Sequence, residues 1–215
     1  MKVIAVSGTP GTGKTTLAKN LARYMRVRSF VGHARVSERH ACENARFSQA
    51  RVQVELSLTH SPSSLSHKSG LNFLYLDVNN LISKYKLYES YDKKRKTKII
   101  DIKRLNKFLI QRIKNFQKNG KYKGIIIDSH LSHYLPKKYV DLCIITKCDI
   151  KVLHRRLKKK RYHKEKIQEN LQAEIFDVCY NESIERKHKV MVVDTTKGFN
   201  NIKKITSKAS DVFAK

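Results

Sequence analysis

The sequence predicts an α/β fold in which five parallel strands form a sheet with helices on both of its faces. Short runs rich in β-branched residues alternate along the chain with segments whose apolar residues recur at helical spacing. A glycine-rich loop joins the first such strand to the first helix. Such alternation is typical of parallel sheets with right-handed crossovers. The length of 215 residues suits a single domain, residues 1–215.

The glycine-rich loop spans residues 8–16, GTPGTGKTT, and matches the phosphate-binding P-loop pattern G-x-x-x-x-G-K-[ST]. The apolar, β-branched run 3–6 precedes the loop, and apolar residues at helical spacing follow it from residue 17 to residue 24. The order of strand, loop and helix is the context that the motif requires. The domain is therefore expected to be a P-loop NTPase.

Each residue type in the loop has a chemical reason. Gly8, Gly11 and Gly13 allow a backbone with positive φ whose N–H groups approach phosphate oxygens, and the helix N-terminus adds partial positive charge. Lys14 can reach the β- and γ-phosphates, and the Thr15 hydroxyl can bind Mg²⁺. The expected ligand is ATP or GTP.

Residues 124–128, GIIID, are typical of a buried parallel strand that ends in a carboxylate. Ligands of open α/β sheets lie at this carboxyl edge, so Asp128 has the form of a Walker B acid that holds Mg²⁺ directly or through water. His130 follows two residues later. It is either a surface loop histidine or a functional group beside the phosphates.

The remaining elements follow from the same patterns. An aspartate at position 77 is a helix N-cap by type, and a glycine at position 120 is expected to end another helix. The further predicted strands are 73–76, 139–146 and 190–194, with an extended segment at 99–102, and the further predicted helices are 77–84, 105–119, 150–157, 164–178 and 202–212.

Composition limits the partners and the compartment. The formal net charge of +28 favours anionic partners, namely nucleotides and RNA, although lysines spread over a solvated surface would give the same count. Cys143 and Cys179 lie in apolar runs and are expected to be buried free thiols in a reducing compartment. No run approaches 18 apolar residues, and the first is too short for a signal peptide, so neither a membrane span nor a leader is expected.

Residues 26–70 differ from the rest of the chain. Arginine replaces lysine as the usual basic residue, Lys68 is the one lysine, and serine and histidine are frequent. This composition predicts a disordered insertion or a segment retained by an error in the gene model. Residues 52–58 alternate and could form an isolated strand. No catalytic residue is expected there.

Taken together, several motifs resemble one family within the nucleoside monophosphate kinase fold: the nuclear adenylate kinase-like ATPases, also called the adenylate kinase isoenzyme six family. The resemblance covers most of the chain outside 26–70. The Asp-x-His step and the helix around residues 167–178 separate this family from ordinary adenylate kinases. The matching segments are 8–16, 87–92 (LYESYD), 127–130 (IDSH), 156–157 and 167–178 (IQENLQAEIFDV).

The resemblance implies a site and a short lid. ATP is expected to bind at Gly11, Gly13, Lys14, Thr15, Thr16 and Lys160, with Lys14, Asp128 and His130 as catalytic residues, Thr15 and Asp128 as Mg²⁺ ligands, and Arg156 and Arg161 as lid candidates. Residues 77–100 resemble the AMP-binding region and residues 159–169 resemble the lid. Within the dense basic run 155–161, a solvated surface is the alternative to a phosphate-neutralising lid.

Two positions depart from the family pattern. Lys160 and Arg161 precede Tyr162 where the family usually has Arg-Gly, and lysine lacks the planar fork that stacks on adenine or grips phosphate. Ser83 stands where a basic residue of the AMP site is common, and the neighbouring Lys84 is the candidate to substitute for it.

Two classes of function remain open. The first is an adenylate kinase, ATP + AMP to 2 ADP with Mg²⁺, that also hydrolyses ATP. The second is an ATP-driven assembly factor with little kinase activity. The resemblance implies a monomer of the nucleus and cytoplasm that acts in small-ribosomal-subunit maturation with a ribosomal protein and pre-ribosomal RNA. A passive RNA-binding module is a weaker alternative, because the P-loop is intact.

Overall fold

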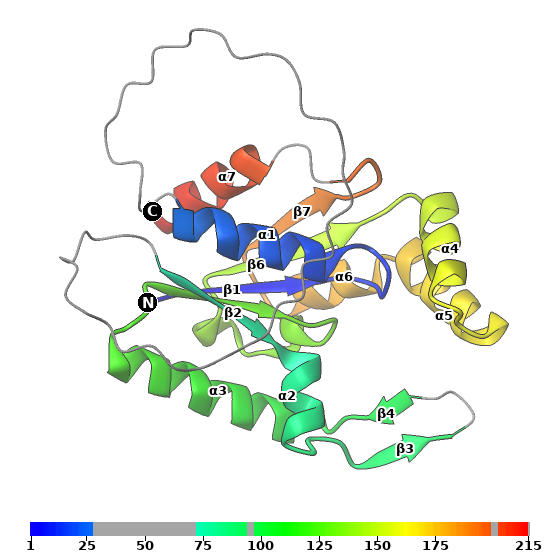
Figure 1. The fold of residues 1–215 in the computed structure, drawn as a ribbon, viewed down its shortest axis with the longest axis horizontal. Coiled ribbons are helices and arrows are strands. Elements are labelled where there is room, and N and C mark those ends of the chain that lie inside the picture. The colour runs from blue at the N-terminus through cyan, green and yellow to red at the C-terminus, as the bar shows by residue number, and fades with distance from the viewer. Residues whose placement is uncertain (28–71, 94–96, 199–201, 215) are drawn as a thin grey trace, which may run out of the picture.

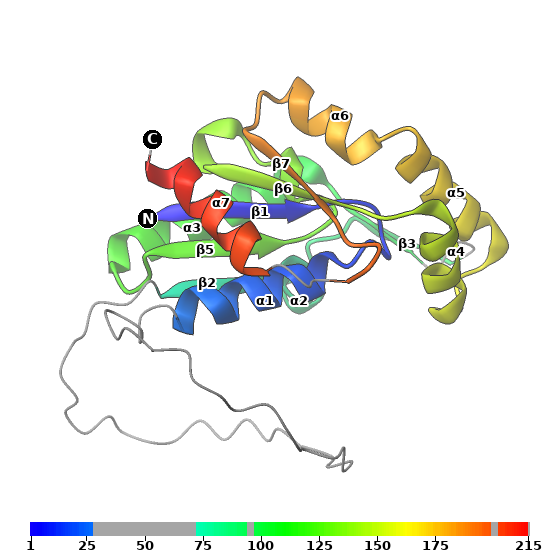
Figure 2. The ribbon, with the colours of Figure 1, turned by 90° about the horizontal axis from the view of Figure 1, so that it is seen from above.

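The computed structural model describes residues 1–27, 72–93, 97–198 and 202–214. Its centre is a five-stranded parallel sheet, as the sequence predicts (Figure 1). The strand order is β2-β5-β1-β6-β7 (Figure 2). The strands are β1 (Lys2–Ser7), β2 (Phe73–Asp77), β5 (Gly124–Asp128), β6 (Leu142–Lys147) and β7 (Val190–Asp194).

Helices cover both faces of the sheet, and the core is two-sided (Figure 2). On one face lie α1 (Lys14–Val27) and α7 (Ile202–Ala214), and on the other lie α2 (Val78–Lys84), α3 (Ile102–Asn119) and α6 (Val178–Glu185). Neighbouring residues of β1 therefore enter different layers: Val3 and Ala5 pack against α3, whereas Ile4 and Val6 pack against α1. Strands buried on both faces explain the continuous apolar runs.

The remaining elements lie beyond the carboxyl ends of the strands, apart from two short turns. Helices α4 (Ile150–Lys159) and α5 (Lys164–Ile175) form one side of this end, and a hairpin of β3 (Ser90–Asp92) and β4 (Thr97–Ile99) lies beyond α2 (Figure 1). Two 3₁₀ turns, η1 (Ser132–Tyr134) and η2 (Lys137–Tyr139), follow β5.

The predicted helix ends are largely confirmed by their caps. Asp77 Oδ1 accepts the N–H of Asn80 at 3.2 Å at the start of α2, and Gly120, with φ 60°, ends α3. The extended segment predicted at 99–102 is correct only at Ile99, because Asp101 caps α3 by accepting the N–H of Lys103 at 2.7 Å.

One predicted helix is wrong. The segment 164–178 is not one helix: α5 ends at Ile175, Asp177 adopts the left-handed conformation with φ 52°, and α6 begins at Val178. The buried side of α5 carries polar residues, and Glu174 Oε1 accepts the N–H of Cys148 at 2.9 Å. Ile175 and Val178 are consequently exposed rather than part of the core.

Three smaller predictions need adjustment. The strand predicted at 139–146 begins only at Leu142, after η2. Cys143 is buried as expected, whereas Cys179 is half-buried, and no described cysteine forms a disulfide. Helix α1 continues to Val27; residues 28–70 of the predicted insertion, including the candidate strand 52–58, lie outside the described residues. Within the described ranges, no helix combines the length and apolarity needed to cross a bilayer.

Candidate active site

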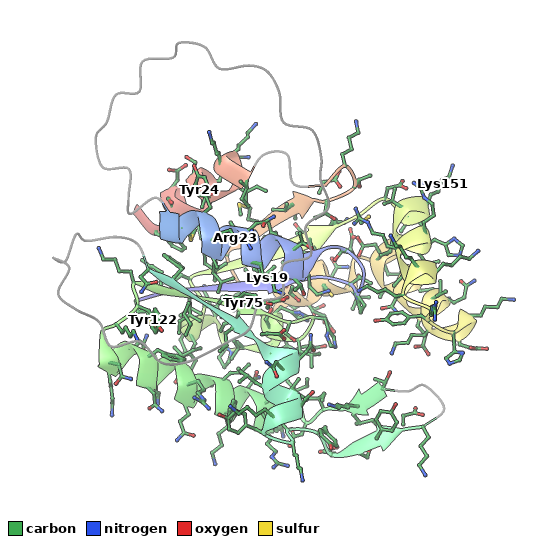
Figure 3. All side chains as sticks on the ribbon, in the orientation of Figure 1. Lys19, Arg23, Tyr24, Tyr75, Tyr122 and Lys151 are labelled. Carbon is green, nitrogen blue, oxygen red and sulfur yellow. The ribbon has the colours of Figure 1, made fainter. Side chains whose placement is uncertain are left out.

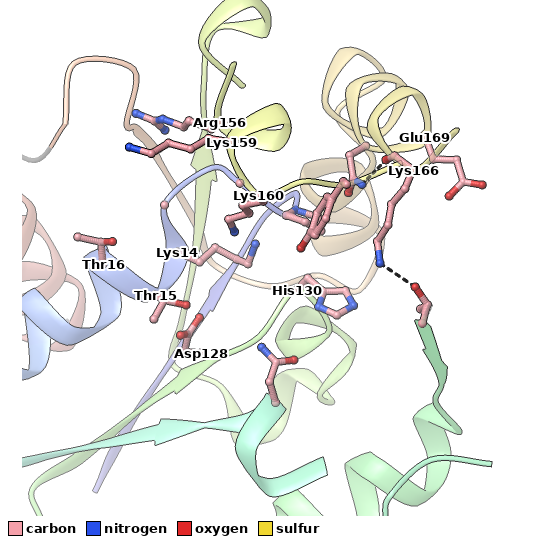
Figure 4. Close-up of a pocket in the computed structure, with 17 residues that line it drawn as sticks. Lys14, Thr15, Thr16, Asp128, His130, Arg156, Lys159, Lys160, Lys166 and Glu169 are labelled. Atoms are coloured by element: carbon pink, nitrogen blue, oxygen red, sulfur yellow. Dashed lines mark hydrogen bonds between the residues drawn. The ribbon is translucent and has the colours of Figure 1, made fainter. Parts of the chain in front are cut away.

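The candidate site lies at the carboxyl edge of the sheet, where β1, β5 and β2 end together. Register pairing sets Val6 of β1 beside Asp128 of β5, and Asp128 beside Asp77 of β2. Because parallel strands share this edge, the loop after β1 and the acid at the end of β5 meet there. A pocket of about 1110 Å³ opens over them (Figure 4).

The P-loop has the positive-φ backbone that its glycines predict. Gly8, Gly11 and Gly13 have φ values of 136°, 97° and 90°. A Cβ on Gly8 would lie 2.5 Å from the Thr146 carbonyl oxygen, so the loop also needs glycine for its close approach to β6. The buried Thr12 hydroxyl donates to the Thr9 carbonyl at 2.7 Å and fixes the turn from inside.

Lys14 begins α1 and points into the pocket (Figure 4). Its Nζ donates to the Thr9 carbonyl at 2.8 Å, so the loop itself supplies an acceptor for the ammonium. Burial lowers the pKa of Lys14 from its usual 10.5 to about 8, against the opposing influence of Asp128. The group is still mainly charged at pH 7 and is held ready for an anion.

Asp128 is buried and has one oxygen in use. The Tyr75 hydroxyl, from β2, donates to Oδ2 at 2.9 Å, while Oδ1 is buried without a hydrogen-bond partner among the described residues. Burial and the charge of Asp128 raise the pKa of Tyr75, so its phenol remains a donor. A buried carboxylate oxygen with no donor is the group that a hard cation would satisfy.

The residues around Asp128 fit a divalent metal. The Thr15 hydroxyl, at the first turn of α1, faces the Asp128 carboxylate (Figure 4). No group of three or more His, Cys, Asp and Glu side chains in the described part of the chain could hold a metal alone. Such a site, with one carboxylate and one hydroxyl, suits a metal that takes its other ligands from phosphate and water.

His130 lines the pocket from the loop after β5 and faces Lys14 across it (Figure 4). Burial, and then the charge of Lys14, lower its pKa from 6.5 to about 4. The imidazole is therefore neutral at physiological pH and keeps one ring nitrogen as an acceptor. Such a group can orient or deprotonate water beside a phosphate.

The basic residues after β6 have two kinds of surroundings: some line the pocket, and one also donates hydrogen bonds to backbone carbonyls. Lys159 and Lys160 line the pocket, and so does Arg156. Arg156 donates from Nη2 to the Thr195 carbonyl at 2.8 Å, which ties α4 to the loop after β7. Arg161 lies in a left-handed turn with φ 56° and is not among the residues lining the pocket.

The far wall of the pocket comes from the region expected to bind AMP. Asn79 of α2 and Thr97 of β4 line it. Lys98 Nζ donates to Ser83 Oγ at 2.8 Å, so a basic side chain lies beside Ser83, although neither residue lines the pocket. Lys166 Nζ of α5 donates to Thr97 Oγ1 at 2.8 Å and spans the pocket between its two sides (Figure 4).

The structure brings together nearly all the site residues that the sequence predicts. Lys14, Thr15, Asp128 and His130 face one cavity, and Thr16, on its rim, points away from Asp128 (Figure 4). The lining residues from the prediction are Gly11, Gly13, Lys14, Thr15, Thr16, Asp128, His130, Arg156 and Lys160.

Some lining residues were not singled out from the sequence. Asn79, Thr97 and Asn170 line the pocket, and Tyr75 orients Asp128 from the neighbouring strand. One signal was available for Tyr75: it stands two residues before the carboxyl end of the strand that pairs with β5. Asn79 and Thr97 have no comparable signal, because short polar residues near loops are common.

Fold and site define a class of protein, the P-loop kinases. A family model described as an AAA domain matches residues 4–177. The solved structure of an unliganded sugar kinase from Janibacter sp. HTCC2649 is similar in fold, with a TM-score of 0.50 at 13% identity, over 100% of this chain and 95% of that one.

Relatives narrow the class. A protein of Methanocaldococcus jannaschii named "Putative adenylate kinase" is 32% identical, over 90% of this chain and 76% of its own. Proteins with the same name from Thermococcus kodakarensis and Pyrococcus furiosus are each 27% identical over 90% of this chain, covering 76% and 75% of their own lengths. The chain belongs to the adenylate kinase-like family of P-loop proteins, an enzyme family of nucleotide kinases.

Proposed function

We propose that this protein is an adenylate kinase that transfers the γ-phosphoryl group of ATP to AMP and that also hydrolyses ATP. One observation carries the proposal: the P-loop face and the face formed by Asn79 and Thr97 line the same pocket. Its volume of about 1110 Å³ exceeds the usual range of about 300–1,000 Å³ for sites that hold one small molecule. In the proposed transfer, the donor nucleotide lies on the P-loop side of this pocket and the acceptor nucleotide on the side of Asn79 and Thr97.

Mg²⁺ is the metal that we assign to Thr15 and Asp128. When bound, it supplies positive charge to the β- and γ-phosphate oxygens. The unpartnered Asp128 Oδ1 supports this assignment.

The chain's own cations act on the phosphates. The P-loop N–H groups and the Lys14 ammonium stabilise charge on the transferred group, and Lys159 and Lys160 approach from the α4 side of the pocket. The Lys14 ammonium exchanges the Thr9 carbonyl for a phosphate oxygen. This exchange costs little, because one acceptor replaces another.

Neutral His130 supports the hydrolytic reaction. With its pKa lowered to about 4, the imidazole accepts a hydrogen bond from water at pH 7. AMP brings its own phosphate oxygen as the nucleophile, so phosphoryl transfer depends less on this residue. Hydrolysis without AMP is the reaction that an ATP-driven assembly factor needs.

The second candidate function is therefore an assembly factor of the small ribosomal subunit, active in 18S rRNA maturation in the nucleus and cytoplasm. The motif resemblance and the net charge of +28 support it. Lys19 and Arg23 project from α1 and Lys151 from α4, so basic side chains cover separate parts of the surface (Figure 3). A monomer with such a surface suits pre-ribosomal RNA and a ribosomal protein as partners. A passive RNA-binding module would not need the intact phosphate site.

The test is ADP and phosphate release from Mg·ATP, measured with and without AMP. AMP should accelerate ADP formation without phosphate release, and ATP alone should give slower release of both. Lys14→Ala should remove both reactions and leave the circular dichroism unchanged. If Lys14→Ala retains turnover within about twofold of the parent, the assignment is wrong. If ATP consumption is indifferent to AMP, the assembly factor is the better description.

A further inference from the structure

A second set of polar side chains lies behind the pocket, between β1, η1 and α6. His133 is only 1% exposed, yet both of its ring nitrogens have partners. Its Nδ1 lies 2.7 Å from Ser7 Oγ, and its Nε2 lies 2.7 Å from Glu182 Oε2. None of the three lines the nucleotide pocket. A polar chain thus crosses the buried space from α6 to the end of β1.

This row of hydrogen-bonded side chains ends at the backbone of His130, the histidine that lines the pocket. Ser7 Oγ lies 3.2 Å from the carbonyl oxygen of His130. Ser7 is also the residue directly before Gly8, the first glycine of the P-loop. These hydrogen-bonded side chains therefore contact both segments that carry the proposed chemistry, the P-loop and the loop of His130.

A nucleophilic role for the serine is excluded by its surroundings. Serine, histidine and a carboxylate in this order resemble a hydrolase triad. Ser7, however, is fully buried within β1, where it pairs with Ile145 of β6. No substrate carbonyl can reach its hydroxyl.

We propose that Ser7, His133 and Glu182 form a positioning relay, in which the tautomer of His133 decides whether the Ser7 hydroxyl donates to the backbone carbonyl of His130 beside the start of the P-loop. The inference rests on the function proposed above, since it is through His130 that the relay acts on ATP turnover.

Proton counting gives the relay two states. In the first, Glu182 accepts the Nε2–H of neutral His133, the bare Nδ1 accepts the single Ser7 hydroxyl proton, and the His130 carbonyl receives none. In the second, Nδ1 carries a proton and donates to Ser7 Oγ, and the Ser7 hydroxyl is free to donate to the His130 carbonyl. The two states hold the His130 backbone differently.

The groups around His133 favour the first state at neutral pH. Burial lowers its pKa, while the facing Glu182 carboxylate opposes that shift and Arg186 and His188 reinforce it. His188 Nε2 also lies 2.9 Å from the His133 carbonyl. The second oxygen of Glu182 accepts the Tyr134 hydroxyl at 2.8 Å, so the carboxylate needs both of its oxygens as acceptors.

Glu182→Gln separates the two states. A glutamine has one acceptor oxygen and one amide donor. With the oxygen on the Tyr134 hydroxyl, the amide donates to Nε2 of His133, and the imidazole must move its proton to Nδ1. The substitution thus switches the tautomer without removing a side chain. Glu185→Gln is the matched control, because Glu185 is exposed on the same helix.

The experiment combines ¹⁵N NMR of the histidine rings, the ¹³C shift of the His130 carbonyl, and ATP turnover. The parent and Glu185→Gln should carry the Nε2–H tautomer of His133. Glu182→Gln should carry Nδ1–H, move the His130 carbonyl shift, and change kcat for ATP hydrolysis by about tenfold with an unchanged KM for ATP. Adding Ser7→Ala to Glu182→Gln should return the carbonyl shift to its parent value, since the hydroxyl that transmits the change is gone.

Several outcomes overturn the relay. They are an Nδ1–H tautomer in the parent, a tautomer switch that leaves the His130 carbonyl shift and kcat unchanged, and additive effects of the two substitutions. The parent measurement decides the first point even if Glu182→Gln does not fold. A parent without ATP turnover rejects the proposed function instead, while the tautomer and the carbonyl shift still decide whether the relay exists.

Discussion

The hydroxyl of Tyr75 donates a 2.9 Å hydrogen bond to Oδ2 of Asp128, and the other oxygen of that carboxylate, Oδ1, is buried with no partner in the described residues. A residue of β2 thus orients the carboxylate at the end of β5, and Oδ1 of Asp128 remains available to a cation. Partners of this kind fix the rotation of a metal-binding carboxylate.

Tyr75→Phe should therefore weaken metal binding. Without its donor, Asp128 can rotate away from Thr15, and we expect the free Mg²⁺ concentration for half-maximal ATP turnover to rise by about tenfold. Tyr122→Phe is the control, because the Tyr122 ring packs edge-on against Phe116 at a centroid distance of 5.9 Å and Tyr122 does not line the pocket. An unchanged Mg²⁺ dependence in Tyr75→Phe would show that Tyr75 does not orient the acid.

ATP binding should weaken as the pH rises through the pKa of Lys14. The unliganded protein loses the Lys14 proton near pH 8, whereas bound phosphate favours the charged form. Above pH 8 binding must therefore take up a proton, and the Kd for ATP should rise by about 30-fold between pH 7 and pH 9.5. The measurement is calorimetry across this range.

Lys14→Arg supplies the control for that profile. Arginine keeps its charge at every pH in this range, so its Kd, whatever its value at pH 7, should be nearly independent of pH. Parallel profiles for the parent and Lys14→Arg would assign the titration to another group.

His130→Ala should separate the two proposed reactions. Because the neutral imidazole assists water, hydrolysis without AMP should slow by about 10²-fold or more. Transfer to AMP should slow much less, because AMP supplies the nucleophilic oxygen. Steady-state ADP formation with and without AMP measures both rates. Equal losses would make His130 a structural residue and leave ordinary adenylate kinase chemistry.

A steric prediction concerns the register between β2 and β5. A Cβ on Gly124 would lie 2.1 Å from Cε1 of the Phe73 ring, so Gly124→Ala should lower the free energy of unfolding by about 3 kcal/mol. In a Phe73→Leu background the cost should fall to about 1 kcal/mol. Urea unfolding of the four proteins measures this coupling.

Gly120→Ala is the matched glycine control. A Cβ there meets nothing within 4 Å, so its cost of about 1–2 kcal/mol comes from the left-handed backbone alone. That cost should be the same with Phe73 or Leu at position 73. If Phe73→Leu reduced the cost of Gly120→Ala as much as that of Gly124→Ala, the coupling would not come from a clash between Phe73 and residue 124.

Elements and site residues could be predicted from the sequence wherever a short local pattern determines them. The P-loop letters and the acid after GIIID predict that Lys14 and Asp128 lie near each other, and both line the pocket, since the carboxyl edge of a parallel sheet brings such residues together. The break at Asp177 was missed because the apolar spacing of Ile175 and Val178 continues that of α5. The inner side of α5 is marked by Ile167, Asn170 and Glu174, and the Glu174 carboxylate accepts the N–H of Cys148 just before α4. The spacing of apolar residues cannot predict that Glu174 is buried, because its carboxylate is buried to accept an N–H from a residue far away in the sequence.

The hydrogen bond between Lys166 and Thr97 has a consequence for how the pocket is entered. It joins the half-buried Lys166 to the exposed Thr97 across the pocket, and a hydrogen bond of this kind contributes only about 0.5–1.5 kcal/mol. An incoming phosphate offers the Lys166 ammonium a stronger partner than a threonine hydroxyl. The anion itself thus breaks the hydrogen bond between Lys166 and Thr97. Neutral solutes of the same size offer Lys166 no such partner, so they meet a narrower entrance than nucleotides do.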